Sequence, residues 1–311
     1  MFRILQVKKP YLCNIQSITL TMQNKLVFSG HDSFNCRALW LKKGYDFIYK
    51  DKVFSSPDAV VDLGIGKNMV NATQFWMKSF GLLNSHNSLS ELADFIFRED
   101  GVDPYLEDTA TLWLLHYQLV TENLSSIYSL VFNEFRKKRI EFNKTQLTHF
   151  IKRKCEENNT VFTEKSVQRD IAVFLRSYVR PVRQSKNIED LYSGLFIDLD
   201  LITQLRKFDE EENTWYRIEN KVRKDLPEEV ILHSILSNTE YEDSITLEQL
   251  ATGHNSVGNI FALSQNDLIN KLNSLASKNK NLTFTDNSGV RVLQLKKKPN
   301  KWDVLKNYYE K

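Results

Sequence analysis

The chain has 311 residues, which is too long for one small core and suits two or three modules. Charged residues make up 26% and hydrophobic residues 41%, as is ordinary for a soluble globular protein. The net charge of +3 does not by itself indicate a nucleic-acid partner, so only local clusters of basic residues can carry that argument.

Several classes are excluded by what the sequence lacks. The cysteines, Cys13, Cys36 and Cys155, are too few and too widely spaced for a disulfide framework or a zinc site. No signal peptide and no run of about 20 apolar residues is present, so we expect a cytoplasmic protein without membrane contact. The segment "GIGKN" lacks the spacing of an ATP-binding loop, and neither GxSxG nor HExxH occurs.

The first part of the chain is read as an extension, residues 1–24, followed by a helix-turn-helix module, residues 25–143. The stretch "FSGHDSFNCRALWLKKGYDFI" predicts an amphipathic helix from near Phe34. A short helix, two glycines and a longer helix from near Lys67 then outline a helix-turn-helix.

The second helix of this pair carries candidate DNA contacts, because such a helix enters the major groove in DNA-binding proteins. Amide side chains pair with adenine and lysines reach guanine or phosphate. The candidates are Lys67, Asn68, Asn71, Gln74 and Lys78. The alternative is that these residues form only the solvent-exposed face of a helix that packs on the core.

An acidic loop follows in "REDGVDPYLEDTATLWLLH". Clustered carboxylates can hold Mg²⁺ or Mn²⁺, which makes Asp103, Glu107 and Asp108 a candidate metal site. Asp108 before Thr109 is also a helix-start signal, and the capping interpretation is favoured. His116 lies in an apolar helix, which predicts a core histidine rather than a ligand.

The second module is predicted at residues 144–186, as two helices with dense positive charge. Lys165, Gln168 and Arg169 lie near the start of its second helix. A basic run precedes the module and comprises Arg136, Lys137, Lys138 and Arg139. Such clusters can neutralise DNA phosphates, and the alternative is a solvated helix face.

The third module is predicted at residues 187–311. Two helices precede "NLTFTDNSGVRVLQL", whose alternation around a Gly-containing turn predicts a β-hairpin. Helix, helix, hairpin is the winged-helix arrangement, with Arg291 on the wing. The predicted fold is therefore mainly α (α+β), with tandem helix-turn-helix or winged-helix modules and short β-hairpin wings.

Four motifs occur in one order: "FSGHDSFNCRALWLKKGYDFI", "LGIGKNMVNATQFWMKSFGLL", "DGVDPYLEDTATLWLLH" and "SVGNIFALSQNDL" followed by "GVR". Together they resemble a bacterial family of unknown function found in DNA phosphorothioation gene clusters, the family of SspB-type DNA-nicking components. The resemblance covers nearly everything after residue 22. It implies double-stranded DNA as a partner. It also implies partner proteins, namely a cysteine desulfurase, a PAPS-reductase-like sulfur transferase and an ATPase; an oligomer remains open.

The resemblance raises the question of which residues would nick DNA. Hydrolysis needs carboxylates that hold a metal, or a histidine that activates water beside a charge clamp. The candidates are His31 as base or metal ligand, Asp32 as ligand or orienter, and Arg37 as phosphate clamp. The alternative is a cap before the first helix, with His31 bonded to backbone. Three hypotheses follow: a metal-dependent nickase (an endonuclease in anti-phage defence), a non-catalytic DNA-recognition subunit that recruits the sulfur machinery, and a protein-binding adaptor.

Overall fold

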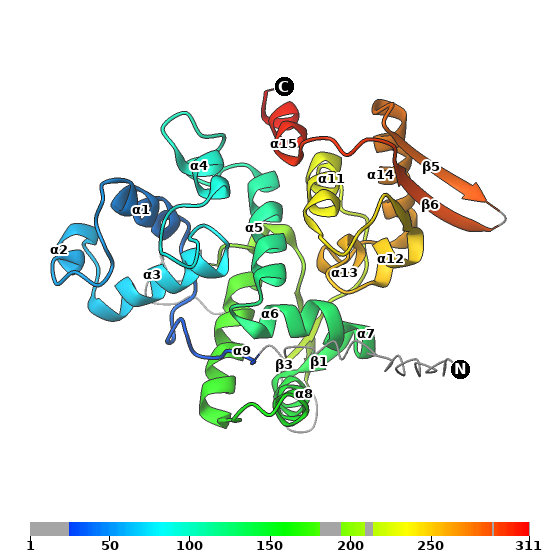
Figure 1. Cartoon of the computed structure of the whole chain (residues 1–311). Coiled ribbons are helices and arrows are strands. Elements are labelled where there is room, and N and C mark those ends of the chain that lie inside the picture. Colours follow the sequence, from blue (N-terminus) through cyan, green and yellow to red (C-terminus); the bar gives the residue numbers. More distant parts are fainter. Residues whose placement is uncertain (1–24, 181–193, 209–213, 288, 311) are drawn as a thin grey trace, which may run out of the picture.

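The computed structural model describes residues 25–180, 194–208, 214–287 and 289–310, so the predicted extension 1–24 lies outside the described residues. Figure 1 shows a mainly helical chain with small antiparallel sheets, which confirms the α+β class. Within the described residues, no helix combines the length and apolar character that a membrane crossing requires.

The N-terminal part is built from α1 (Ala38–Tyr49), α2 (Ala59–Leu63), α3 (Lys67–Ser79) and α4 (Glu91–Phe97). Helix α1 begins at Ala38 and not near Phe34, because residues before it form a loop whose Phe34 carbonyl accepts a hydrogen bond from the Trp76 indole. Helix α3 begins at Lys67 as predicted. It ends before Gly81, which has the positive φ of 65° that glycine adopts easily.

The central part comprises α5 (Thr109–Glu122), α6 (Ser126–Leu130), a π-helical turn (Val131–Phe135), α7 (Arg136–Lys138), β1 (Glu141–Asn143), α8 (Lys144–Glu157), α9 (Glu164–Tyr178), a 3₁₀ turn (Ile197–Leu199), β2 (Thr203–Phe208) and β3 (Thr214–Arg217). Asn143 ends β1 and also caps α8, because its side-chain oxygen accepts the Gln146 N–H at 2.9 Å. Strand and helix therefore meet without a connecting loop.

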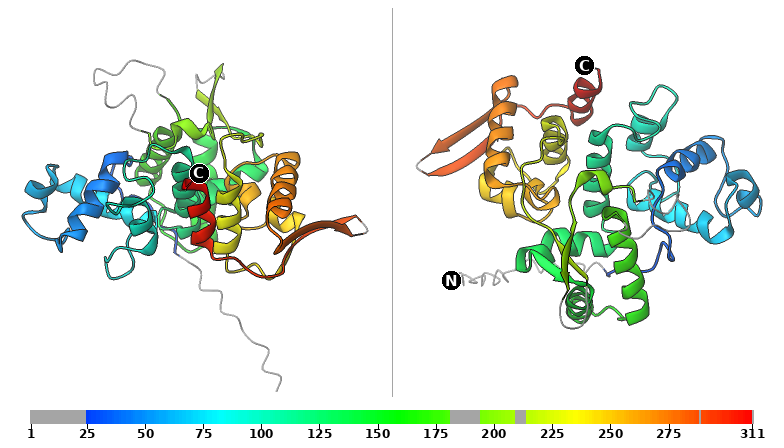
Figure 2. Two further views of the ribbon diagram at one scale, coloured as in Figure 1. Left: turned by 90° about the horizontal axis from the view of Figure 1, so that it is seen from above. Right: turned by 180° about the vertical axis from the view of Figure 1, so that it is seen from behind.

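The C-terminal part comprises α11 (Glu228–Ser237), β4 (Ser244–Thr246), α12 (Leu247–Thr252), α13 (Val257–Ile260), α14 (Gln265–Lys278), β5 (Leu282–Asn287), β6 (Val290–Leu295) and α15 (Lys301–Tyr309). Thr246 and Gln249 form a reciprocal capping box that starts α12. Strands β5 and β6 pair as the predicted hairpin, which projects from the body of the molecule in Figures 1 and 2.

Two segments of the chain share one order of elements. In the first, a helical run ending at α7 is followed by β1, α8, α9, β2 and β3, with strand order β1-β3-β2. In the second, α11 is followed by β4, α12, α13, α14, β5 and β6, with strand order β4-β6-β5. The first sheet pairs Phe142 with Tyr216 and so joins residues on both sides of the predicted boundaries. The division into modules at 143/144 and 186/187 stays a prediction.

The centre of the core is His116 on α5. Its Nε2–H donates to the Ile260 carbonyl at 2.9 Å, so Nδ1 accepts the Tyr178 hydroxyl hydrogen at 2.9 Å. The rings of Phe132, Tyr178 and Phe196 lie around the imidazole with centroids 4.6–5.7 Å away. Burial lowers the pKa of His116 to about 3. The predicted core histidine is confirmed, and it joins α5, α9 and α13.

The connection between the two repeated segments is bonded at both of its ends. The Ile218 N–H donates to the Ile140 carbonyl at 2.9 Å in the first segment. Lys221 exchanges backbone hydrogen bonds with Ala262 and Ser264 in the second, at 3.0 and 2.9 Å. The two segments are therefore linked by a short connection whose backbone is hydrogen-bonded to both of them.

We predict that His116→Phe lowers the free energy of unfolding by about 2–3 kcal/mol, because it keeps the ring volume and leaves two buried polar partners unpaired. A depressed folded pKa contributes stability above the unfolded value of 6.5 that is lost as pH falls toward 3. The slope of stability against pH between 6.5 and 4 should therefore flatten by up to about 1.4 kcal/mol per pH unit in the variant.

Urea denaturation at a series of pH values measures both effects. The exposed His86→Phe is the matched control and should leave the profile as in the wild type. An unchanged slope in His116→Phe would show that this histidine is not the neutral group that the fold requires.

Candidate nucleic-acid interface

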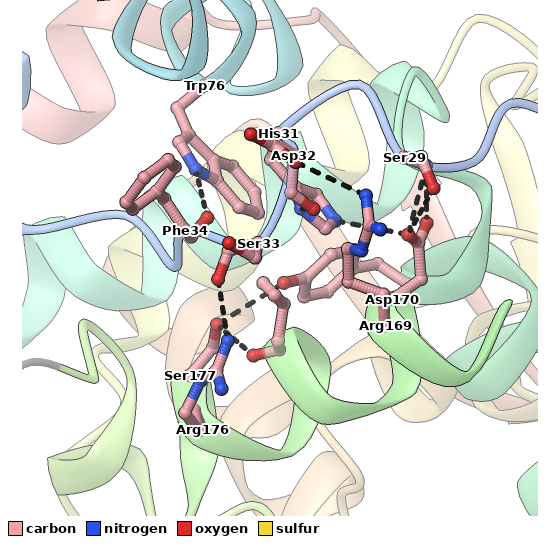
Figure 3. A network of polar contacts seen from close by, with 12 residues as sticks. Ser29, His31, Asp32, Ser33, Phe34, Trp76, Arg169, Asp170, Arg176 and Ser177 are labelled. Atoms are coloured by element: carbon pink, nitrogen blue, oxygen red, sulfur yellow. Dashed lines mark hydrogen bonds and ion pairs between the residues drawn. The ribbon is translucent and has the colours of Figure 1, made fainter. Parts of the chain in front are cut away.

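The loop that precedes α1 is fixed against α9 and α3 (Figure 3). The Ser29 N–H donates to both carboxylate oxygens of Asp170, at 2.9 and 3.0 Å. The Arg176 guanidinium donates to the Ser33 carbonyl at 2.7 Å. These bonds satisfy loop backbone groups that no helix or strand serves. The polar motif "SGHDSF" is thus tied to helices distant in the sequence.

His31 is fully buried in this network. Its ring stacks on Trp76 with centroids 5.1 Å apart. Nδ1 lies 3.2 Å from the Asp32 carbonyl oxygen, which can only accept, so Nδ1 carries a hydrogen. Nε2 faces Asp170 Oδ1 at 3.7 Å. Burial lowers the pKa of His31 to about 4 and raises the pKa of Asp170 to about 7.

The three predicted catalytic residues do not converge. Asp32 turns outward and pairs with Arg169 at 3.2 Å, with both side chains partly exposed. Arg37 is the N-cap residue of α1, and its guanidinium lies 5.8 Å from the Trp40 ring centroid. His31 is buried, and its ring nitrogens face the Asp32 carbonyl and the Asp170 carboxylate rather than solvent. The alternative reading, a histidine bonded to backbone before the first helix, matches this geometry.

The carboxylates of Asp103 and Asp108 in the acidic loop accept hydrogen bonds from nearby backbone N–H groups. The two oxygens of Asp103 accept the N–H groups of Glu107 and Asp108 at 2.9 and 3.0 Å. Asp108 caps α5 through the Ala110 N–H at 2.8 Å and accepts the Tyr308 hydroxyl at 3.2 Å. Across the described ranges, no three His, Cys, Asp or Glu side chains gather as a metal set. The bonds of Asp103 and Asp108 in this loop fit helix capping, and the metal site stays a prediction.

The predicted contacts on α3 lie mostly on the surface. Lys67, Asn68 and Asn71 are exposed, whereas Gln74 and Lys78 are half-buried. The Gln74 amide donates to the Asn87 side chain at 3.1 Å, which commits it to the neighbouring loop. The first turn of α3 is the accessible part of this prediction.

The basic run at α7 divides in two. Arg136 is buried and donates to the Asn259 carbonyl at 2.9 Å and to the Asn220 side chain, so it is a structural residue between the two repeated segments. Lys137, Lys138 and Arg139 are exposed, and Lys137 reaches the Thr252 carbonyl at 2.7 Å. Only the last three of the run offer surface charge.

Helices α8 and α9 enclose a groove of about 430 Å³. Its lining includes the basic Lys144, His149 and Lys152, and Gln168, whose amide donates to the acidic Glu164 in the same lining at 3.0 Å. Lys165 is exposed on the first turn of α9. On the wing of the second segment, Arg291 is exposed and pairs with Asp286 at 3.2 Å. The predicted cations Lys165 and Arg291 are thus at the surface, whereas Arg169 is held by Asp32.

Sequence reasoning missed Asp170, which organises the loop. The sequence did hold a signal, because Asp170 falls on the apolar stripe of its helix between Val167, Ile171 and Phe174. A carboxylate on a core-facing stripe needs a buried partner. Sequence periodicity alone does not say that the partners are Ser29 and His31.

The comparisons with known proteins agree with one another. The family described as "Protein of unknown function (DUF4007)" matches residues 28–309. Two solved structures are similar at 28% identity, covering 91% of this chain and 88% of theirs: "Magnesium ion-bound SspB crystal structure", with a TM-score of 0.79, and "SspB crystal structure", with 0.80. None of the curated proteins matches the chain.

We predict that Asp170→Ala lowers the free energy of unfolding by about 2–4 kcal/mol, because it leaves the Ser29 N–H without its acceptor and removes the carboxylate that faces the buried His31 Nε2. Asp198→Ala is the matched control, since Asp198 forms an exposed ion pair with Arg180. Its loss should cost less than about 1 kcal/mol. Urea midpoints that fall equally in the two variants would contradict the structural role of Asp170.

Proposed function

We propose, from the premise that this chain belongs to the DUF4007 family, that it is a DNA-binding component of a bacterial DNA phosphorothioation system. Its likeness to two SspB structures over most of both chains supports this assignment. The resemblance of its ordered motifs to the family in phosphorothioation clusters supports it from the sequence side.

The observation that carries DNA binding is the repeated element order. Each segment runs helix, strand, helices (α8 and α9, or α12 to α14) and two further strands, with the first strand beside the last, and this order supports a winged-helix interpretation. We read both segments as winged-helix modules. In such modules the second helix of the pair faces the major groove. The corresponding helices are α9 and α14.

The surface of the first module has the chemistry for phosphate contacts. Lys144 and Lys152 lie beside the α8–α9 groove, and Lys165 lies on the adjoining turn of α9. Lysine side chains bind phosphate as point charges and give no base discrimination. This surface therefore suits backbone binding that positions the protein on a duplex.

Recognition is the role that the described residues support better than intrinsic nicking. The predicted carboxylates act as caps, and His31 is buried. In this proposal the partner proteins, the cysteine desulfurase, the sulfur transferase and the ATPase, carry out sulfur incorporation. Nicking is the second candidate, and the magnesium-bound state of one SspB structure favours it.

We predict duplex binding that weakens as salt rises. Replacing Lys144, Lys152 and Lys165 by alanine should lower the slope of log affinity against log salt by about 0.9 for each lost phosphate contact. Replacing the exposed Lys43, Lys50 and Lys306 is the matched control and should leave the slope unchanged. Fluorescence anisotropy with a labelled duplex measures it. Absence of binding, together with a stable complex with a partner protein, would favour the adaptor hypothesis.

A plasmid-relaxation assay with Mg²⁺ or Mn²⁺, and with EDTA as control, separates recognition from nicking. Recognition leaves supercoiled plasmid intact under conditions that give a gel shift, whereas open-circular product that needs the metal establishes a nickase.

We predict that Glu107→Gln does not change the outcome of this plasmid assay, because Glu107 is exposed beside carboxylates that accept backbone hydrogen bonds. Loss of nicking in this variant would restore the acidic loop as a metal site.

A further inference from the structure

The outer face of α14 carries a row of asparagines, Asn266, Asn270 and Asn273, which we call the amide stripe. At about 100° per residue, the three fall within a sector about 60° wide. All three are exposed, and no hydrogen bond within the described residues uses their side chains. The buried residues Leu268, Leu272 and Leu275 lie on the opposite side of the helix. The stripe therefore faces directly away from the core.

The only acidic side chain on α14 is turned away from the stripe. Asp267 is buried, and its Oδ2 accepts the Arg223 N–H at 2.9 Å. Ser264 caps the helix and accepts the Asp267 N–H at 3.3 Å. The exposed residues of α14 itself thus carry hydrogen-bond donors and acceptors and no carboxylate.

The charges around the stripe are mixed, because Asn270 lines a pocket together with Asp108, Asp225, Glu228 and Glu229. Residues 244–298 contain seven Lys and Arg against three Asp and Glu, a balance of +4 in a chain whose total is +3. Lys296 and Lys297 are exposed at the base of the hairpin. A groove of about 690 Å³ lies between α12, the start of α14 and the hairpin, and its lining includes Gln265, Arg291 and the acidic Glu248 and Asp286. The hairpin stands out beside α14 in both views of Figure 2.

We propose that the amide stripe of α14 reads adenines in the major groove of double-stranded DNA. An asparagine side chain pairs with adenine through two hydrogen bonds: its oxygen accepts from the N6 amino group and its NH₂ donates to N7. Asn266 to Asn273 spans about 10 Å along the helix, which matches a few successive base pairs. This inference rests on the proposed DNA-binding function and adds its base preference. The α8–α9 surface then supplies phosphate contacts, and α14 supplies sequence discrimination.

The experiment uses the full chain and a pool of duplexes with a randomised centre. Bound duplexes are sequenced for the wild type, for Asn266→Ala, Asn270→Ala and Asn273→Ala, and for Asn307→Ala, an exposed helical asparagine on α15 that serves as control. Alanine is a good helix former, so the variants should fold. We expect an adenine-containing motif for the wild type and the control, with one position relaxed in each stripe variant.

The selected duplex is then remade with 7-deazaadenine, which removes only the N7 acceptor. Wild-type affinity should fall by about fivefold to a hundredfold at a contacted position, whereas the matching alanine variant should be insensitive there. Duplex binding without a motif, or a motif that survives all three substitutions, would overturn the role of α14 and leave DNA binding intact. Absence of any duplex binding would overturn both proposals.

Discussion

A single neutral histidine holds the architecture together. His116 bonds to a hydroxyl and a carbonyl at once, burial keeps the ring neutral, and both partners come from other parts of the chain. Because the ring is enclosed by aromatic side chains, an unpaired nitrogen there would cost the full desolvation of a polar group. Helices α5, α9 and α13 are thus held in one arrangement by requirements of hydrogen bonding as well as by packing.

The same principle explains the motif that most resembled an active site. In "SGHDSF" the polar residues are used to attach a loop to α9: Asp170 accepts the Ser29 N–H, and His31 lies between Asp170 and Trp76. Perturbed pKa values accompany burial wherever it occurs, and catalysis is only one reason for burial. The shifted pKa values of His31 and Asp170 follow from burial of the pair in the attachment of this loop.

Local signals in the sequence predicted local structure well. Periodicity located the start of α3, alternation located the β5–β6 hairpin, and the Asp108 cap was favoured over a metal ligand. What local patterns could not show was pairing between distant segments. The β1–β3 pairing and the burial of Arg136 against Asn259 depend on residues far away in the chain. A cluster of basic residues in the sequence likewise predicts a charged surface, but it does not show which member is buried by tertiary contacts, as Arg136 is.

The bonded connection at residues 218–221 has a mechanical consequence. Backbone hydrogen bonds tie it to Ile140 on one side and to Ala262 and Ser264 on the other. These bonds set the spacing and angle of the two repeated segments in the structure. A ligand that touches both must match a preset spacing and angle, and it loses little affinity to ordering of the connection. Such a ligand binds tightly when its two contact sites have the matching spacing, and it binds weakly when that spacing is changed.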